Sequence, residues 1–373
     1  MSVRCFAAGA RLLLCALAVA VCASARADAQ DAGPTTGRIV YIEPANPPGK
    51  LKVKQKRGAV PADATVGMPV RRGYLLTLAS TARAAVYCAD GTRHDLQPGP
   101  QGCPCTAAAS GTIYDGSTIP RPRGHDTARG TFPVIISPRK TLLLTTRPNI
   151  RWSPVASAAT SAAAPTYRVS LYTDAMELVW RKDGISKTEM SYPSDEQELV
   201  RGEVYKVVVQ TGRASSQQEH SADLGFTVLT EAEAKGIGAA EESVRRLNLP
   251  ADETRLLVAD LYAARGLSSE AIEMLTSLRD TLKGPTVLRM LGDLYAASGL
   301  HREAVNEYEK ALALPQTKSD TEGQALALTA LGRSYSALGN GERARARFAS
   351  AVQAFRKLGD RVTIEQLKDG RLR

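Results

Sequence analysis

The chain of 373 residues has room for about two or three domains of usual size. Lysine and arginine number 48 against 38 aspartates and glutamates, a net charge of +10, and the basic residues are spread along the chain rather than gathered in one run. Such a spread is typical of a solvated surface, and the export predicted from residues 1–29 argues against a nucleic-acid partner. No segment after residue 29 is apolar for long enough to span a bilayer.

Residues 1–29 have the order of a secretory signal peptide. Two arginines precede an apolar core at residues 12–21 (LLLCALAVAV), and overlapping Ala-x-Ala cleavage signals follow at residues 25–29. This order predicts cleavage and export, most simply to a bacterial periplasm. Two alternatives stay open at this stage. One is an uncleaved membrane anchor, for which the run is short, and the other is lipidation at Cys22, which lacks the usual small residue before it.

Residues 33–110 predict a small β domain. Residues 50–54 (KLKVK) alternate as a strand with one solvated face does. Residues 66–75 (VGMPVRRGYL) lead into a strand at residues 84–92 (AAVYCADGT), whose Asp-Gly pair suits a hairpin turn. These segments resemble the FecR-like β domain over about 45 residues, and they depart from it at Tyr74, where that family usually has Asp.

Three cysteines remain after the signal segment, namely Cys88, Cys103 and Cys105. An oxidising compartment favours a disulfide between Cys88 and either Cys103 or Cys105, which would leave one thiol over. The Cys-Pro-Cys run lacks the two-residue spacer and the second ligand pair of common zinc sites, so no metal site is expected.

Residues 111–130 are rich in glycine, proline, serine, threonine and arginine and predict a linker. Residues 131–229 predict a β-sandwich, because apolar strand-like runs follow one another at close spacing. The runs lie at residues 134–136, 142–144, 150–152, 167–171, 178–180, 205–209 and 226–229.

The same region carries marks of a known sandwich family. Trp152 and Trp180 fall in two of the runs and are expected in the core. Leu199, Gly202 and Tyr205 have the spacing of a tyrosine corner, in which the hydroxyl ties down the chain before a late strand. The region therefore resembles an immunoglobulin or fibronectin type III domain.

Residues 230–373 predict a helical array built from three copies of one pattern. Thr230 and Glu233 form a capping box that opens a first helix. In each copy a small residue lies three before a tyrosine, a glycine four after it and an alanine nine after it. The tyrosines are Tyr262, Tyr295 and Tyr335, the glycines Gly266, Gly299 and Gly339, and the alanines Ala271, Ala304 and Ala344. The pattern resembles the tetratricopeptide repeat, a helix, a tight turn and a second helix. The first helix and a polar helix near residues 361–367 are expected to cap the two ends.

The resemblance implies a groove lined by the first helix of each repeat, where a protein partner binds. Matched to this sequence, the lining positions include Asp260, Arg289, Met290, Asp293, Thr329, Arg333 and Ser336. We call these residues the predicted binding face. The basic clamp with which some relatives hold a C-terminal carboxylate is absent, because the corresponding positions do not carry it.

No pattern predicts catalysis. The four histidines show no helical zinc spacing, and no nucleophile elbow, phosphate loop or calcium loop is present. We therefore expect a non-enzymatic, multidomain β + α chain with a small β domain, a β-sandwich and a C-terminal helical array. Its expected role is an exported scaffold that binds an unidentified protein and uses no cofactor. The alternative is an envelope polymer-binding protein that grips peptidoglycan or another glycan through its β domains, which an aromatic content of only 5% disfavours.

Overall fold

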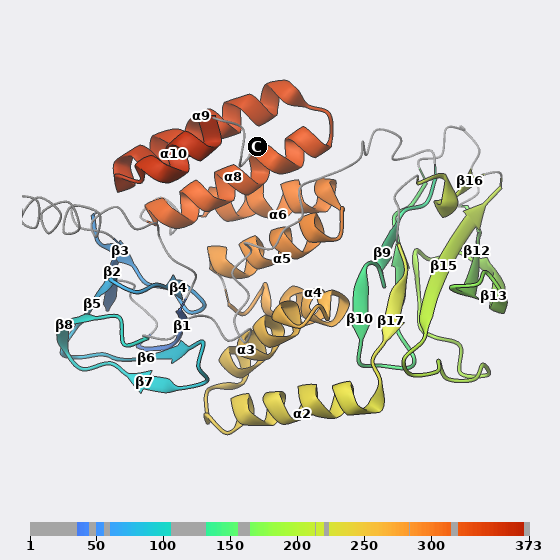
Figure 1. Cartoon of the computed structure of the whole chain (residues 1–373), viewed down its shortest axis with the longest axis horizontal. Helices are drawn as coiled ribbons and strands as arrows, with labels where there is room; N and C mark the ends of the chain where they lie inside the picture. Colours follow the sequence, from blue (N-terminus) through green and yellow to red (C-terminus); the bar gives the residue numbers. More distant parts are fainter. Residues whose placement is uncertain are drawn as a thin grey trace, which may run out of the picture. The chain divides into compact units, whose positions relative to one another are not determined.

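The computed structural model describes residues 36–44, 50–55, 60–105, 132–155, 165–212, 214–219, 224–282, 284–314 and 320–368, to which all structural statements below refer. The predicted signal peptide and the predicted linker lie outside these residues. All described residues belong to one compact unit, Pro34–Arg373. None of the helices described is both long and apolar enough for a membrane span. Figure 1 shows the elements along the chain.

In the described part of residues 36–105 the chain forms two four-stranded sheets with the orders β4-β1-β6-β7 and β3-β2-β5-β8. Their core contains Ile39, Leu51, Val53, Leu76 and Val86. The expected alternation holds in β2, where Leu51 and Val53 are buried and Lys52 is exposed. The strands are β1 Gly37–Glu43, β2 Leu51–Lys54, β3 Ala62–Asp63, β4 Pro69–Val70, β5 Leu75–Leu78, β6 Arg83–Cys88, β7 Arg93–Asp95 and β8 Gly99–Gly102. We call this part the β domain.

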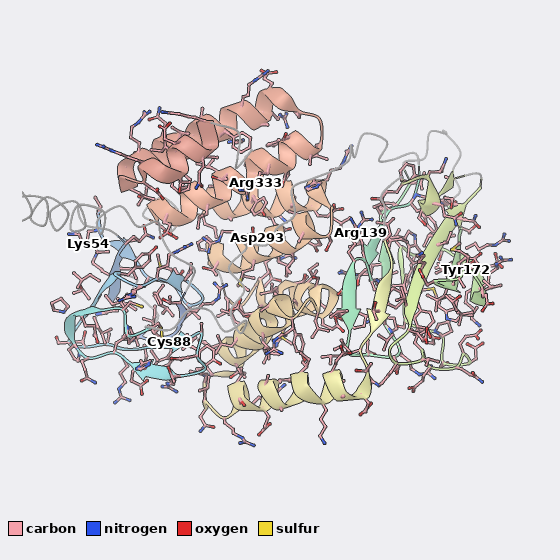
Figure 2. All side chains as sticks on the ribbon, in the orientation of Figure 1. Lys54, Cys88, Arg139, Tyr172, Asp293 and Arg333 are labelled. Atoms are coloured by element: carbon pink, nitrogen blue, oxygen red, sulfur yellow. A yellow bond between two sulfur atoms is a disulfide. The ribbon has the colours of Figure 1, made fainter. Side chains whose placement is uncertain are left out.

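A disulfide closes the end of the β domain. It joins Cys88 at the end of β6 to Cys105, one of the two pairings that the sequence left open, and Cys103 is the free and partly buried thiol. Figure 2 marks Cys88. The two cysteines are 17 residues apart in the sequence, and in the chain-entropy picture closing a loop of this length stabilises the fold by roughly 3 kcal/mol.

Residues 132–229 form a sandwich of two sheets around one core, in which both tryptophans are buried. One sheet has the order β10-β17-β15-β12-β13 with β16 beside β15, and the other has the order β14-β11-β9. The Tyr205 hydroxyl accepts a hydrogen bond from the Val200 backbone N–H at 2.9 Å, as expected of a tyrosine corner. The strands are β9 Ile135–Ser137, β10 Thr141–Leu143, β11 Ile150–Trp152, β12 Tyr167–Thr173, β13 Leu178–Ile185, β14 Glu189–Met190, β15 Val204–Thr211, β16 Ala214–Ser215 and β17 Phe226–Val228, with a 3-10 turn, η2, at Ser216–Gln218.

The remaining described residues form the helical array. Its helices are α2 Glu231–Arg245, α3 Ala251–Ala264, α4 Ser268–Leu278, α5 Pro285–Ala297, α6 His301–Ala313, α8 Thr321–Ala337, α9 Gly341–Leu358 and α10 Arg361–Lys368. The predicted capping box opens α2. The fold class predicted from the sequence is thus confirmed, since small, mainly antiparallel sheets precede a C-terminal helical array.

Three helix pairs, α3 with α4, α5 with α6 and α8 with α9, follow the repeat pattern. The glycine of each pattern lies in the turn between the two helices with φ between 74° and 79°, a region that favours glycine over other residues. The alanines Ala271, Ala304 and Ala344 are buried. Close packing explains the glycine three before the tyrosine in the second and third repeats, because a Cβ at Gly292 would lie 2.5 Å from the Tyr308 ring and one at Gly332 would lie 2.8 Å from Phe348.

The ends of the array are covered as expected. Ile237 and Val244 of α2 pack into the same core cluster as α3, and Ile364 and Leu367 of α10 pack against the last repeat. These contacts bury the faces that a terminal repeat cannot cover with a neighbouring repeat.

Candidate functional site

The structure separates the predicted binding face into buried and accessible residues. Three of its members are buried, with 0% of Asp260, 1% of Met290 and 6% of Thr329 exposed. Arg289, Asp293 and Arg333 are partly buried, and Ser336 is exposed. Asp293 lies on α5 and Arg333 on α8 (Figure 2).

In this state of the chain Asp260, Met290 and Thr329 are therefore not accessible to a partner, and partner binding at the predicted binding face stays a prediction. The reason differs for each residue. Met290 packs in the apolar core of the array. The Thr329 hydroxyl donates a hydrogen bond to the Ala325 carbonyl of its own helix at 2.9 Å. Asp260 is covered by the β domain.

Arg38 of β1 holds Asp260 of α3 through two parallel hydrogen bonds. Its Nε donates to Oδ2 at 2.7 Å and its Nη2 donates to Oδ1 at 2.9 Å, while Nη1 donates to the Gly67 carbonyl at 3.0 Å. Only 2% of Arg38 is exposed. A buried, two-pronged guanidinium–carboxylate pair fixes orientation as well as distance, so it aligns the β domain on the first repeat.

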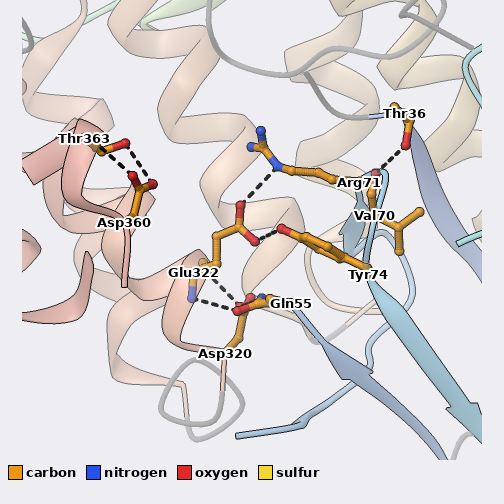
Figure 3. A network of polar contacts seen from close by, with 10 residues as sticks. Thr36, Gln55, Val70, Arg71, Tyr74, Asp320, Glu322, Asp360 and Thr363 are labelled. Carbon is orange, nitrogen blue, oxygen red and sulfur yellow. Dashed lines mark hydrogen bonds and ion pairs between the residues drawn. The ribbon is translucent and has the colours of Figure 1, made fainter. Parts of the chain in front are cut away.

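A second set of contacts lies at the start of α8, as Figure 3 shows. Gln55 donates from Nε2 to Asp320 at 2.7 Å and accepts the Glu322 backbone N–H at 3.3 Å. The Tyr74 hydroxyl donates to the Glu322 carboxylate, whose other oxygen lies 3.0 Å from Arg71 Nε. Asp320 also caps α8. The β domain is therefore attached to the first and the third repeat.

Apolar packing continues between these polar contacts. A Cβ at Gly67 would lie 2.9 Å from Leu256 and 3.1 Å from Thr286, so the backbone at Gly67 touches α3 and α5 directly. The φ of +84° at this position also favours glycine. One core cluster joins the two parts, and the β-domain residues in it are Val40, Ala85, Tyr87 and Ala89.

Burial shifts the pKa values of Asp293 and Arg289, two residues of the predicted binding face. It raises the pKa of Asp293 to about 6, against the opposing effects of the Arg289 charge and of the Tyr308 hydroxyl, which donates to Oδ1 at 2.6 Å. Burial also lowers the pKa of Arg289, which the carboxylates of Asp293 and Asp320 oppose. Both groups are thus held in a poorly solvated site where each depends on opposite charges nearby.

Opposite charges from the two parts meet here in equal number. The carboxylates are Asp260, Asp293, Asp320 and Glu322, and the arginines are Arg38, Arg71, Arg289 and Arg333. All four carboxylates belong to the array, whereas Arg38 and Arg71 belong to the β domain. Each part therefore carries an imbalance that the other neutralises.

The sandwich contacts the array at the turns of the first two repeats. The backbone N–H of Leu142 donates to the Gly266 carbonyl at 3.0 Å, and that of Leu144 donates to Glu270 Oε1 at 2.8 Å. Burial raises the pKa of Glu270 to about 7. Arg139, which is 2% exposed, donates to the Ser298 carbonyl at 2.6 Å and pairs with Glu219.

The sequence did not single out the residues of the β domain that make these contacts, Arg38, Gln55 and Arg71. One signal was present. Tyr74, the position at which the sequence departs from the FecR-like pattern, donates to Glu322. An aspartate there would place a second negative charge beside that carboxylate. Within the described ranges no cluster of three metal-ligating side chains occurs.

Comparisons with known proteins agree with the repeat pattern. The tetratricopeptide-repeat family model matches residues 287–322, which cover most of α5, all of α6 and the start of α8. The crystal structure of MamA is similar at 19% sequence identity, covering 38% of this chain and 82% of that chain with a TM-score of 0.28. A search of curated proteins found no match. The match of the family model shows that the C-terminal array contains a tetratricopeptide repeat, an architecture that implies protein partners.

Proposed function

We propose that the protein is an exported, non-enzymatic scaffold that binds another protein through its helical array. The observation that carries this proposal is the array itself. It has the repeat pattern of a protein-binding architecture, and it already holds a folded protein surface, the β domain, by a buried two-pronged ion pair.

The part of the predicted binding face that stays accessible lies on α8. Ser336 is exposed and Arg333 is partly buried there. A partner that meets the protein while the β domain is docked contacts this end of the face first. The Ser336 side chain is small, so a larger side chain at this position blocks that approach without disturbing a core contact.

Capture of envelope proteins tests the proposal. Full-length Ser336→Trp and Ser350→Trp are compared with the parent protein by crosslinked pull-down from envelope fractions. Both serines are exposed, but Ser350 lies on α9, the second helix of its repeat. We expect Ser336→Trp to lose at least tenfold of the partner captured by the parent and Ser350→Trp to keep it. Equal capture by all three proteins, or equal loss in both variants, rejects the array face as the site.

Export is part of the proposal and rests on residues 1–29 together with the Cys88–Cys105 disulfide, since disulfides persist in oxidising compartments. Mass spectrometry of the native protein should find a chain that starts near Asp28 or Gln30. An intact Met1 end or a lipid on Cys22 contradicts this.

We also infer that the two β parts belong to the families they resemble. The glycine turn at Gly91 and the strands around it support a FecR-like β domain, and the Tyr205 contact with Val200 supports an immunoglobulin-like sandwich. The glycan-binding alternative has less support, because Trp152 and Trp180, whose ring faces would suit a sugar, are 2% and 3% exposed.

A further inference from the structure

We call the array residues at and beside the contact with the β domain the covered surface, and their charges are unbalanced without that domain. The array contributes the carboxylates of Asp260, Asp293, Asp320 and Glu322 and the guanidinium groups of Arg289 and Arg333. Of these six groups, four are negative and two are positive. The β domain adds Arg38 and Arg71, which restore the balance. A surface with excess negative charge favours a cationic ligand over a neutral or anionic one.

The geometry selects arginine in particular. Asp260 accepts from two nitrogens of Arg38 at once, at 2.7 and 2.9 Å, which a planar guanidinium can supply and a lysine ammonium cannot. Glu322 accepts from Tyr74 and pairs with Arg71, so it binds an arginine and a tyrosine three residues apart. Both sites are occupied from the same chain.

One short stretch of the β domain makes several of these contacts. Residues 66–74 (VGMPVRRGY), which we call the docking segment, contain Arg71 and Tyr74 on Glu322 and Gly67 against Leu256 and Thr286. The docking segment thus serves as a bound example of an arginine-bearing ligand of the covered surface.

From these observations we propose that the covered surface is an acidic receptor for arginine-bearing protein segments and that the β domain closes it in cis. This rests on the proposed function, because it names the chemistry of the partner and the way in which access to the array is controlled. A partner in trans must present arginine to Asp260 and Glu322 after the β domain leaves. Its apparent dissociation constant is therefore the intrinsic value divided by the fraction of open protein.

A synthetic peptide tests the receptor. The probe is a fluorescent peptide that copies the docking segment, and its control carries alanine in place of Arg71. Binding is measured by anisotropy with the full chain, with Arg38→Met and with Arg83→Met. Arg38→Met removes both hydrogen bonds that Arg38 donates to Asp260 in the docked state, so it favours the open state. Arg83→Met is the matched control, since Arg83 is an exposed residue of the same domain.

We expect Arg38→Met to bind the probe at least tenfold more tightly than the parent and Arg83→Met to bind it like the parent. Adding Glu322→Gln to Arg38→Met should remove the gain, and the alanine peptide should not show it. Arg38→Gln breaks the same ion pair, again from the β-domain side so that the receptor keeps both carboxylates, and should also open the covered surface. The result therefore does not depend on one variant folding well. Far-UV circular dichroism checks that each variant keeps its helices.

The proposal is overturned if both opened variants bind the probe no better than the parent, or if an acidic peptide of the same length binds them more tightly. The assay needs no natural partner, so it separates the two proposals. If the probe binds but Ser336→Trp does not change envelope capture, the arginine receptor is supported and the proposed scaffold function is rejected. If the probe does not bind but Ser336→Trp reduces envelope capture, the arginine receptor is rejected and the scaffold function is supported.

Discussion

The side chains of Arg38 and Asp260 meet across 222 residues of sequence, and both are almost completely buried. Removing both from water is unfavourable, and their mutual attraction offsets that cost only while both are present. The pair therefore contributes more to the specificity of docking than to net stability.

For Asp260→Ala we expect a loss of about 3–5 kcal/mol in the free energy of unfolding, because Arg38 stays buried without the carboxylate that accepts two of its hydrogen bonds. Arg38→Met combined with Asp260→Leu should recover most of this loss, since an apolar pair of similar volume needs no compensation. Urea unfolding of the single and double variants measures both. A double variant as unstable as Asp260→Ala would show that the charge is not the cause.

Glu270 should make the stability depend on pH. Burial raises its folded-state pKa from 4.5 to about 7, so the folded chain holds this proton more tightly than the unfolded chain. The stability from the protonated form is complete below about pH 4.5 and is lost as the pH rises through 7, roughly 3 kcal/mol at most. Glu270→Gln should remove this part of the decline between pH 5 and pH 8.

The measurement is urea unfolding at both pH values, with Glu342→Gln as the control because Glu342 is an exposed glutamate at the start of α9. If Glu270→Gln and Glu342→Gln change the pH dependence equally, burial of Glu270 is not its source.

At the scale of the element, the repeats show how one small residue sets the distance between two helices. Gly292 lies where α5 meets the Tyr308 ring of α6, with 2.5 Å available to a Cβ. Gly236, in the middle of α2, has open space around it. The same substitution should therefore have opposite effects at the two positions.

Gly292→Ala should destabilise the protein by about 1–3 kcal/mol through overpacking. Gly236→Ala should stabilise α2 by roughly 0.5–1 kcal/mol, because alanine restricts the unfolded chain and favours a helix. Thermal melts of both variants decide the matter. A Gly292→Ala protein that melts with the parent would mean that α5 and α6 are not packed this closely.

The elements themselves were predictable from the sequence because their signals are local. The Tyr, Gly and Ala spacing encodes a turn and a close packing within one repeat, and Thr230 with Glu233 marks the start of α2. The docking of the β domain was not predictable in this way. Neither period nor spacing relates Arg38 to Asp260, and only the unusual Tyr74 hinted at a contact outside its own domain. A position that the repeat pattern assigns to a partner, Asp260, is therefore already bound by Arg38 of the same chain.

At the scale of the whole molecule, the two β parts and the array are not independent domains joined only by linkers. Arg139 joins the sandwich to the turn after α5, and Gly266 accepts a hydrogen bond from β10. The array thus holds both β parts. Breaking one of these contacts therefore changes the surface on which the chain can bind other proteins.

The shared core also sets the order in which the newly made chain can mature. Val40, Ala85, Tyr87 and Ala89 belong to a core cluster whose other members lie mainly on α2–α5, helices that are made after the β domain. At roughly 5–20 residues per second, the ribosome needs about 10–45 s to advance from Arg38 to Asp260. During that interval the β domain exposes these apolar side chains and Arg38, which are buried in the finished protein. A chain that ends before the array should thus leave an aggregation-prone fragment, and timely synthesis of the C-terminal helices becomes the step that protects the N-terminal domain.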